Sequence, residues 1–214
     1  MSILNTIKNI KAEDFVNYKK PSLFIGMGGC DWKCCFEAEV NNSICQNSAL
    51  GQAPPLEISS EYLYKMYESN DITQAIVFGG LEPLYNEQSR NELIELIKGF
   101  REFSDDDIVI YTGYYPYEVY DFIKSILSFK NITVKFGRYI PDSPPKYDDV
   151  LGVYLASDNQ YAVKLKNRPD IIQGLKETKG YCPCMVKQNE NTLCCCSVFK
   201  KQSKGVCHCG LWEK

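Results

Sequence analysis

TQAIVFGG, residues 73–80, is a continuous apolar run that ends in two glycines. Runs of this length and composition are typical of strands buried on both faces, as in a parallel sheet. Three similar runs occur in the chain: PSLFIGMG at 21–28, DDIVIYTGY at 106–114 and NITVKFG at 131–137. We therefore expect four buried strands.

The segments between these predicted strands have the character of helices. SSEYLYKMYES at 59–69 begins with serines that can cap a helix. NEQSRNELIELIKGFREF at 86–103 carries apolar residues at helical spacing, and PYEVYDFIKSILSF at 116–129 opens with a proline. The alternation of strand and helix predicts an α/β fold with right-handed crossovers and a mostly parallel sheet.

The second half of the chain changes character after the last of these strands. YIPDSPPKYDD at 139–149 is rich in proline and is expected to form a surface loop, and residues 151–165 return to a strand-like pattern. RPDIIQGLKETKG at 168–180 indicates a short helix that ends before a glycine. We expect two units, residues 1–167 and a smaller cysteine-rich unit at 168–214.

Composition excludes several classes of protein. The net charge of the 214-residue chain is −3 and no basic run occurs, which argues against nucleic-acid binding. The amino terminus is mixed polar and charged, and no stretch approaches the ~20 apolar residues of a membrane span. We therefore expect a cytoplasmic protein without a membrane or nucleic-acid partner.

The cysteines fall into two groups. Four of the eleven lie between residues 30 and 45, none lies between Gln46 and Tyr181, and seven lie between Cys182 and Cys209. In a reducing compartment, dense cysteines indicate metal or redox sites rather than structural disulfides, and an odd count fits a disulfide framework poorly. Two separate cysteine sites are the simplest interpretation.

Glycines mark the ends of all four predicted strands, in GMGGC, FGGLEP, YTGY and KFGR. Ligands of parallel α/β sheets collect outside the carboxyl ends of the strands, and glycine lets the backbone approach a ligand closely. The first of these ends leads directly into CDWKCCFEAEVNNSICQN, residues 30–47. We expect a ligand site there, either an iron–sulfur cluster or a zinc site that uses all four cysteines.

GCDWKCC, CQN, VFGGLEP, IVIYTGY, KFGR and LGVYLASDNQ occur in this order along the chain. Together they resemble the radical S-adenosylmethionine (SAM) activases of anaerobic ribonucleotide reductase, over residues ~14–165. Two departures stand out. The usual C-x3-C-x2-C spacing would place a cysteine where Glu37 stands, and the usual GGEP motif carries an inserted leucine here.

This resemblance implies a partial (β/α) barrel with SAM bound to the open iron of a [4Fe-4S] cluster. It implies that Cys30, Cys34 and Cys45 hold the cluster, with Cys35 as an alternative to Cys34. The residues implied to contact the methionine end of SAM are Gly79, Gly80 and Glu82, and the Glu82 carboxylate would accept a hydrogen bond from its ammonium group. Thr112 and Gly113 would line the same pocket.

The carboxyl-terminal cysteines have a different spacing and occur in three tripeptides: CPC at 182–184, CCC at 194–196 and CHC at 207–209. His208, the single histidine of the chain, lies between two cysteines and can supply or accept a proton near neutral pH. A zinc ribbon with spare thiols is one interpretation of this pattern.

CPC, CxC and CHCGL in this order are similar to the catalytic chain of ferredoxin:thioredoxin reductase, over residues ~168–214. The similarity implies a second [4Fe-4S] cluster and a redox-active disulfide between Cys184 and Cys209, with His208 assisting proton delivery. The implied cluster ligands are Cys182, Cys194, Cys196 and Cys207, and Cys195, where the family usually has another residue, is able to exchange roles with its neighbours.

Three functions follow from these resemblances. The first is an activase that forms the glycyl radical of an anaerobic ribonucleotide reductase and carries its own disulfide-reducing module. The second is a ferredoxin-dependent reductase of thioredoxin-like proteins, in which the SAM-type domain is a relay or docking surface. The third, which is not enzymatic, is a zinc adaptor. Ferredoxin or flavodoxin is the expected electron donor.

Overall fold

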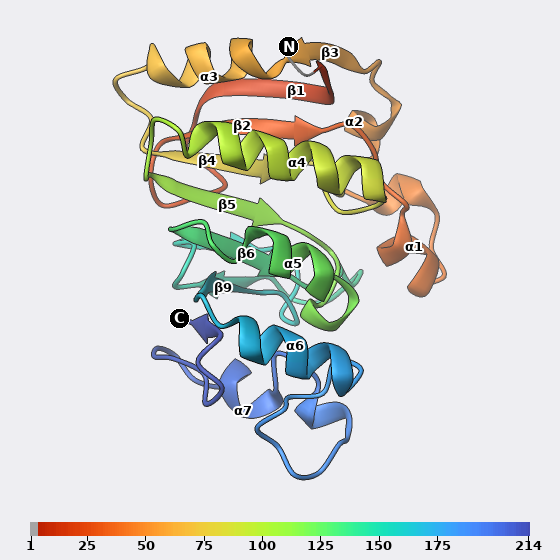
Figure 1. Cartoon of the computed structure of the whole chain (residues 1–214). Coiled ribbons are helices and arrows are strands. Elements are labelled where there is room, and N and C mark those ends of the chain that lie inside the picture. Colours follow the sequence, from red (N-terminus) through yellow and green to blue (C-terminus); the bar gives the residue numbers. More distant parts are fainter. Residues whose placement is uncertain (1–3) are drawn as a thin grey trace.

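An eight-stranded sheet organises the computed structural model, which describes residues 4–214 (Figure 1). Its strand order is β10-β9-β6-β5-β4-β2-β1-β3. The strands are β1 (Leu4–Asp14), β2 (Ser22–Met27), β3 (Leu56–Ser59), β4 (Ala75–Gly79), β5 (Asp107–Tyr111), β6 (Ile132–Phe136), β9 (Tyr161–Leu165) and β10 (Trp212–Glu213). A separate hairpin pairs β7 (Lys146–Asp148) with β8 (Val153–Leu155).

The four strands predicted from apolar runs are confirmed as the parallel core, because β2, β4, β5 and β6 pair in parallel. The expectation of a mostly parallel sheet is wrong at the edges. β1 and β3 on one side, and β9 and β10 on the other, add antiparallel pairs. The described strands form an open sheet from β10 to β3 and no closed barrel, and the expectation was of a partial barrel.

The predicted helices are present. They are α3 (Ser60–Glu68), α4 (Glu87–Phe100), α5 (Tyr120–Ile126) and α6 (Pro169–Glu177). The Ser59 hydroxyl accepts a hydrogen bond from the Tyr62 N–H and so caps α3, and Asn86 caps α4 in the same way. The segment opened by Pro116 begins as a 3-10 turn, Pro116–Glu118, before α5 starts.

Shorter helices accompany the cysteine-rich segments. They are α1 (Lys33–Glu37) and α2 (Ser48–Gln52) after β2, α7 (Ser197–Lys200) in the tail, and two 3-10 turns, Asn42–Ile44 and Glu190–Thr192. The arrowheads of β2, β4 and β5 point toward the side of the molecule where α1 lies (Figure 1). The first cysteine segment therefore sits at the carboxyl ends of the parallel strands, as the sequence predicts.

Alternate residues of the parallel strands face two different layers. Ile76 and Phe78 of β4 belong to the large core that also contains buried residues of α3, α4 and α5; Figure 1 shows α4 and α5 in front of the strands. Ala75 and Val77 face the opposite side, where they pack against Leu151. Both faces are thus buried, which explains why these strands read as continuous apolar runs.

The proline-rich segment at 139–149 is more ordered than the expected surface loop. It contains β7, and the buried Asp148 carboxylate accepts hydrogen bonds from the N–H groups of Val150, Leu151 and Ala162. The hairpin it forms with β8 covers the face of the sheet opposite the helices.

The cysteine-rich tail shares the main core. Trp212 in β10 pairs with Leu165 in β9, and its ring packs edge-on against Phe136 of β6 at 5.5 Å. Ile172 and Leu175 of α6 join the same core. The boundary near residue 167 remains a prediction, but the two segments it separates meet in one sheet.

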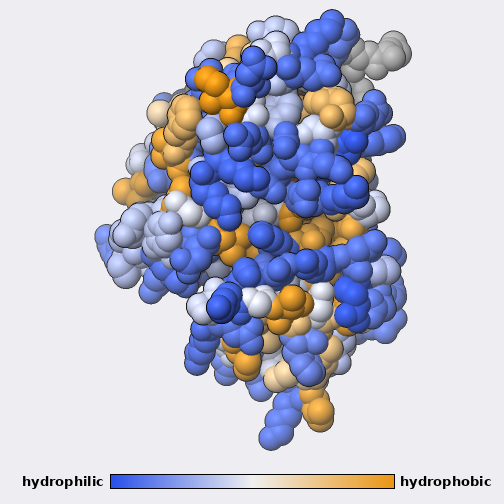
Figure 2. All heavy atoms as spheres, turned by 90° about the vertical axis from the view of Figure 1, so that its left-hand side faces the viewer, coloured by the Kyte–Doolittle hydropathy of each residue, from blue (hydrophilic) through white to orange (hydrophobic). Residues whose placement is uncertain are grey.

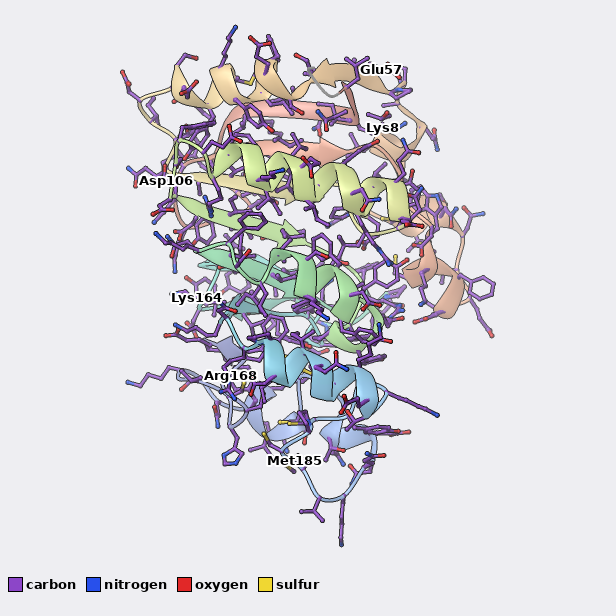
Figure 3. The ribbon with its side chains drawn as sticks, in the orientation of Figure 1. Lys8, Glu57, Asp106, Lys164, Arg168 and Met185 are labelled. Carbon is purple, nitrogen blue, oxygen red and sulfur yellow. The ribbon has the colours of Figure 1, made fainter. Side chains whose placement is uncertain are left out.

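The side of the molecule that is on the left in Figure 1, away from α1, is largely hydrophilic, with apolar side chains in small groups (Figure 2). Asp106, at the amino end of β5, lies on that side (Figure 3). Within residues 4–214, no helix combines the length and the apolar character needed to cross a membrane.

Candidate functional site

The first cysteine segment opens onto a cavity of about 490 Å³. Cys30, Cys34 and Cys45 all line this cavity. Cys35 follows Cys34 on α1 but is 2 % exposed and is not part of the cavity wall. The structure therefore places on one cavity the three cysteines that the resemblance selects, whereas the side chain of Cys35 is buried outside that cavity.

Burial sets the chemistry of these thiols. It raises the pKa of Cys30 and of Cys34 to about 12, and it raises the pKa of Cys45 as well. Each thiolate would need a nearby cation to form at neutral pH, and iron supplies one when it binds. Two backbone N–H groups already point at sulfur: that of Trp32 at Cys30 (3.3 Å) and that of Asn47 at Cys45 (3.4 Å).

No three His, Cys, Asp or Glu side chains in residues 4–214 are grouped so as to hold a single metal ion. The ligands of a cluster attach to separate iron atoms, so a cluster requires thiolates around a common cavity rather than around one point. Three cysteines on one wall, largely shielded from water and with N–H donors at two sulfurs, fit a cluster of this kind.

Glu82 lies next to these cysteines and is held by three donors. Its carboxylate accepts hydrogen bonds from the Thr112 hydroxyl (2.7 Å), the Gly113 N–H (2.7 Å) and the Leu84 N–H (3.0 Å). Burial nevertheless raises the pKa of Glu82 to about 7. Glu82, Thr112 and Gly113 all line the cavity, so the structure places these three predicted residues together.

The two glycines of GGLEP have different surroundings. Gly80 lines the cavity with φ = +78°, a conformation that glycine adopts freely, and a Cβ there would lie 2.8 Å from Leu50. Gly79 ends β4 and is absent from the cavity wall; a Cβ there would lie 3.1 Å from Tyr111. The structure thus supports only Gly80 as a residue next to a ligand.

Two residues of the cavity were not singled out in the sequence. Lys135 of β6 is 7 % exposed, donates to the Gly137 carbonyl (3.0 Å) and has its pKa lowered to about 8 by burial. Asn9 of β1 carries a buried side-chain oxygen without a hydrogen-bond partner. A lysine within the apolar run NITVKFG was a detectable signal for the first, whereas nothing in the sequence marks the second.

The tail forms a second cavity, of about 390 Å³. Its wall contains every tail residue that the sequence predicts to be functional: Cys182, Cys184, Cys194, Cys196, Cys207, His208 and Cys209. Cys195 lines it too. Figure 3 shows sulfur atoms of the tail gathered between the labelled Arg168 and Met185.

Within this cavity the thiols contact one another. The sulfurs of Cys207 and Cys209 are 3.2 Å apart. Hydrogen bonds from Cys209 lower the pKa of Cys182 and of Cys207, and the same bonds raise the pKa of Cys209. The tail therefore already favours thiolates at two of its four expected ligands.

The proposed redox pair lies on the same cavity. All eleven cysteines are free thiols in this structure, so the expected disulfide between Cys184 and Cys209 remains a prediction. Cys184 is exposed at the cavity, Cys209 is buried, and both interact with Cys182. His208 is exposed on the cavity wall beside them.

A comparison with known families indicates the class of the domain that contains the first cavity. Residues 20–160 match a family model described as "4Fe-4S single cluster domain". The match covers more than half of the chain and includes Cys30, Cys34 and Cys45 but none of the tail cysteines. The chain therefore belongs to this family, and residues 20–160 form an iron–sulfur cluster-binding domain. No curated protein and no solved structure shows significant similarity to the chain.

Proposed function

We propose that the protein is a radical SAM enzyme that activates a glycyl-radical partner of the anaerobic ribonucleotide reductase type. One observation carries this proposal. One cavity at the carboxyl ends of the parallel strands is lined by three cysteines, by the buried carboxylate of Glu82 and by the buried side chain of Lys135. A [4Fe-4S] cluster at the three cysteines would supply the electron that cleaves SAM to methionine and a 5′-deoxyadenosyl radical.

The polar residues of the cavity suit the methionine end of SAM. Glu82 carries a carboxylate that can accept a hydrogen bond from an ammonium group. Lys135 carries the opposite charge and can pair with a carboxylate, and the unpartnered oxygen of Asn9 can accept from a hydroxyl or an amine. The volume of about 490 Å³ lies within the range of ~300–1,000 Å³ found for small-molecule sites.

We also propose that the tail reduces disulfides. Cys182, Cys194, Cys196 and Cys207 would hold a second [4Fe-4S] cluster, and Cys184 and Cys209 would form the exchangeable disulfide, with His208 delivering a proton. Reduction of a disulfide needs two electrons, and a one-electron donor must therefore act twice. A cluster beside both thiols would stabilise the half-reduced state between the two transfers. Ribonucleotide reduction can leave an oxidised cysteine pair in the partner, which links the two activities.

The charge distribution supports an acidic electron donor. Residues 161–214 hold ten Lys and Arg against four Asp and Glu, a net charge of +6, whereas residues 1–160 hold fourteen against twenty-three, a net charge of −9. Most of the tail's basic side chains are exposed. The excess of basic side chains in residues 161–214 favours association with an acidic protein such as ferredoxin or flavodoxin.

The test is formation of the glycyl radical. The anaerobically reconstituted protein is mixed with SAM, dithionite and the reductase, and electron paramagnetic resonance (EPR) is expected to show a glycyl doublet. A reductase with its radical-bearing glycine replaced by alanine is the control and should give no doublet. A reductase that is activated by another activase but gives no signal here would contradict the proposal.

The exposed Cys184 thiol favours a second candidate, a ferredoxin-dependent reductase of thioredoxin-like proteins. In this case thioredoxin reduction would be lost in Cys184→Ser and in Cys209→Ser and would be unaffected by SAM. Reduction of thioredoxin together with an absence of SAM cleavage would favour this candidate over the activase.

A further inference from the structure

Trp212 donates hydrogen bonds to two cysteines of the tail. Its backbone N–H donates to the Cys207 sulfur at 3.1 Å, and its indole N–H donates to the Cys194 sulfur at 3.2 Å. The side chain is 1 % exposed. One residue thus contacts two of the sulfurs that we assign to the tail cluster.

The surroundings hold this arrangement in place. Trp212 pairs with Leu165 of β9, its carbonyl accepts a hydrogen bond from the Cys207 N–H (2.8 Å), and its ring packs edge-on against Phe136. These contacts fix the indole relative to the main sheet. A buried indole N–H needs an acceptor because it can only donate, and here that acceptor is sulfur.

Cys195, the neighbour that could exchange roles with Cys194, has a different environment. Its thiol lies next to the Tyr161 hydroxyl, which is buried beneath the tail. The indole N–H therefore distinguishes between two adjacent cysteines, because it donates to the sulfur of Cys194.

Hydrogen bonds to the thiolates of an iron–sulfur cluster are among the factors that set its reduction potential. Reduction adds negative charge to the cluster and its sulfurs, so an N–H donor stabilises the reduced state more than the oxidised one. A donor at a ligand sulfur therefore raises the potential.

We propose that Trp212 is a positioning residue that orients Cys194 and Cys207 and raises the reduction potential of the tail cluster through its indole N–H. This inference goes beyond the proposed function and depends on it for the presence of that cluster. Because Trp212 pairs with Leu165 of β9, it also connects these two cysteines to the central sheet.

The experiment isolates the tail cluster in the full-length chain. Replacement of Cys30, Cys34 and Cys45 by alanine removes the first site, and anaerobic reconstitution is expected to leave about four irons per chain in the tail. A potentiometric titration followed by absorbance and EPR then gives the midpoint potential of that cluster alone.

Trp212→Phe in this background retains the ring and the backbone N–H and removes the indole donor. We expect a tenfold change in the equilibrium between oxidised and reduced cluster, which is a shift of about 59 mV to more negative potential for one electron. Phe136→Leu is the matched control because it loosens packing against the indole and leaves both donors, so its potential should stay close to that of the parent.

Each outcome decides between specific alternatives. An unchanged potential in Trp212→Phe with full iron content would overturn the role of the indole and leave the tail cluster intact. An equal shift in Phe136→Leu would assign the effect to packing and also overturn it. A tail without iron in the parent would contradict both this inference and the second cluster of the proposed function.

Discussion

Glu82→Gln should change how the stability of the protein depends on pH. Burial raises the pKa of Glu82 from 4.5 to about 7 in the folded protein. Between these two values the folded chain binds the proton more tightly than the unfolded chain does. The contribution of Glu82 to stability is therefore fully present below pH 4.5 and is lost as the pH rises through 7.

The size of the effect follows from this shift. One pKa unit corresponds to 1.36 kcal/mol, so a shift of roughly 2.5 units amounts to about 3 kcal/mol. Because glutamine carries no charge at any pH, Glu82→Gln should become more stable relative to the parent by up to about 3 kcal/mol between pH 4.5 and pH 7.5. Above that range the difference should stay constant.

The measurement is urea unfolding of the metal-free protein at a series of pH values, with stability expressed as the difference between parent and variant. That difference removes contributions shared by both chains. Glu61→Gln is the control, because Glu61 is exposed and its hydrogen bond to Lys65 lowers its pKa, so its effect should be small and of opposite sign. A parent–variant difference that is flat between pH 4.5 and pH 7.5 would refute the burial argument for Glu82.

Three further predictions concern the two cavities. Lys135→Met should weaken SAM binding in calorimetry and should be more stable than the parent at neutral pH. Burial lowers the pKa of Lys135 to about 8, so the free-energy cost of burying the charged lysine is greatest below pH 8 and disappears as the pH rises toward 10.5. Equal SAM affinity in parent and variant would exclude an ion pair between SAM and Lys135. Gly80→Ala should lower the free energy of unfolding by about 1–2 kcal/mol because residue 80 has a positive φ, and unchanged urea unfolding would contradict this. In the metal-free protein, iodoacetamide should modify the exposed Cys184 before the buried Cys194, as read by mass spectrometry of peptides, and simultaneous modification would show that the tail is open in solution.

The central strands could be predicted because both of their faces are buried. β4 and β6 read as apolar runs, and their ends carry the glycines that lead into the cavity. β1 could not be recognised in the same way, since most of it is at least partly exposed and two of its buried residues, Asn5 and Asp14, are polar. β10 has two residues, which is too short for any periodicity, and forms only because the tail folds back onto β9.

The candidate site was predictable in composition but only partly in geometry. The resemblance to radical SAM activases predicted a shared site for Cys30, Cys34, Cys45 and Glu82, and the structure places all four on one cavity. The choice between Cys34 and Cys35 depends on which way a five-residue helix faces, and so short a segment carries no periodicity that reveals this from the sequence. Hydrogen bonds such as those from Trp212 are likewise set by tertiary contacts.

The proposed chemistry requires the three cysteines of the first cavity to hold a cluster that reduces SAM. The most direct measurement is the formation of 5′-deoxyadenosine from SAM by the dithionite-reduced protein, with iron content determined on the same samples. We expect product from the parent and from Cys35→Ser, and loss of product in Cys34→Ser. A fully iron-loaded parent that forms no 5′-deoxyadenosine would exclude SAM cleavage as the activity of this cavity.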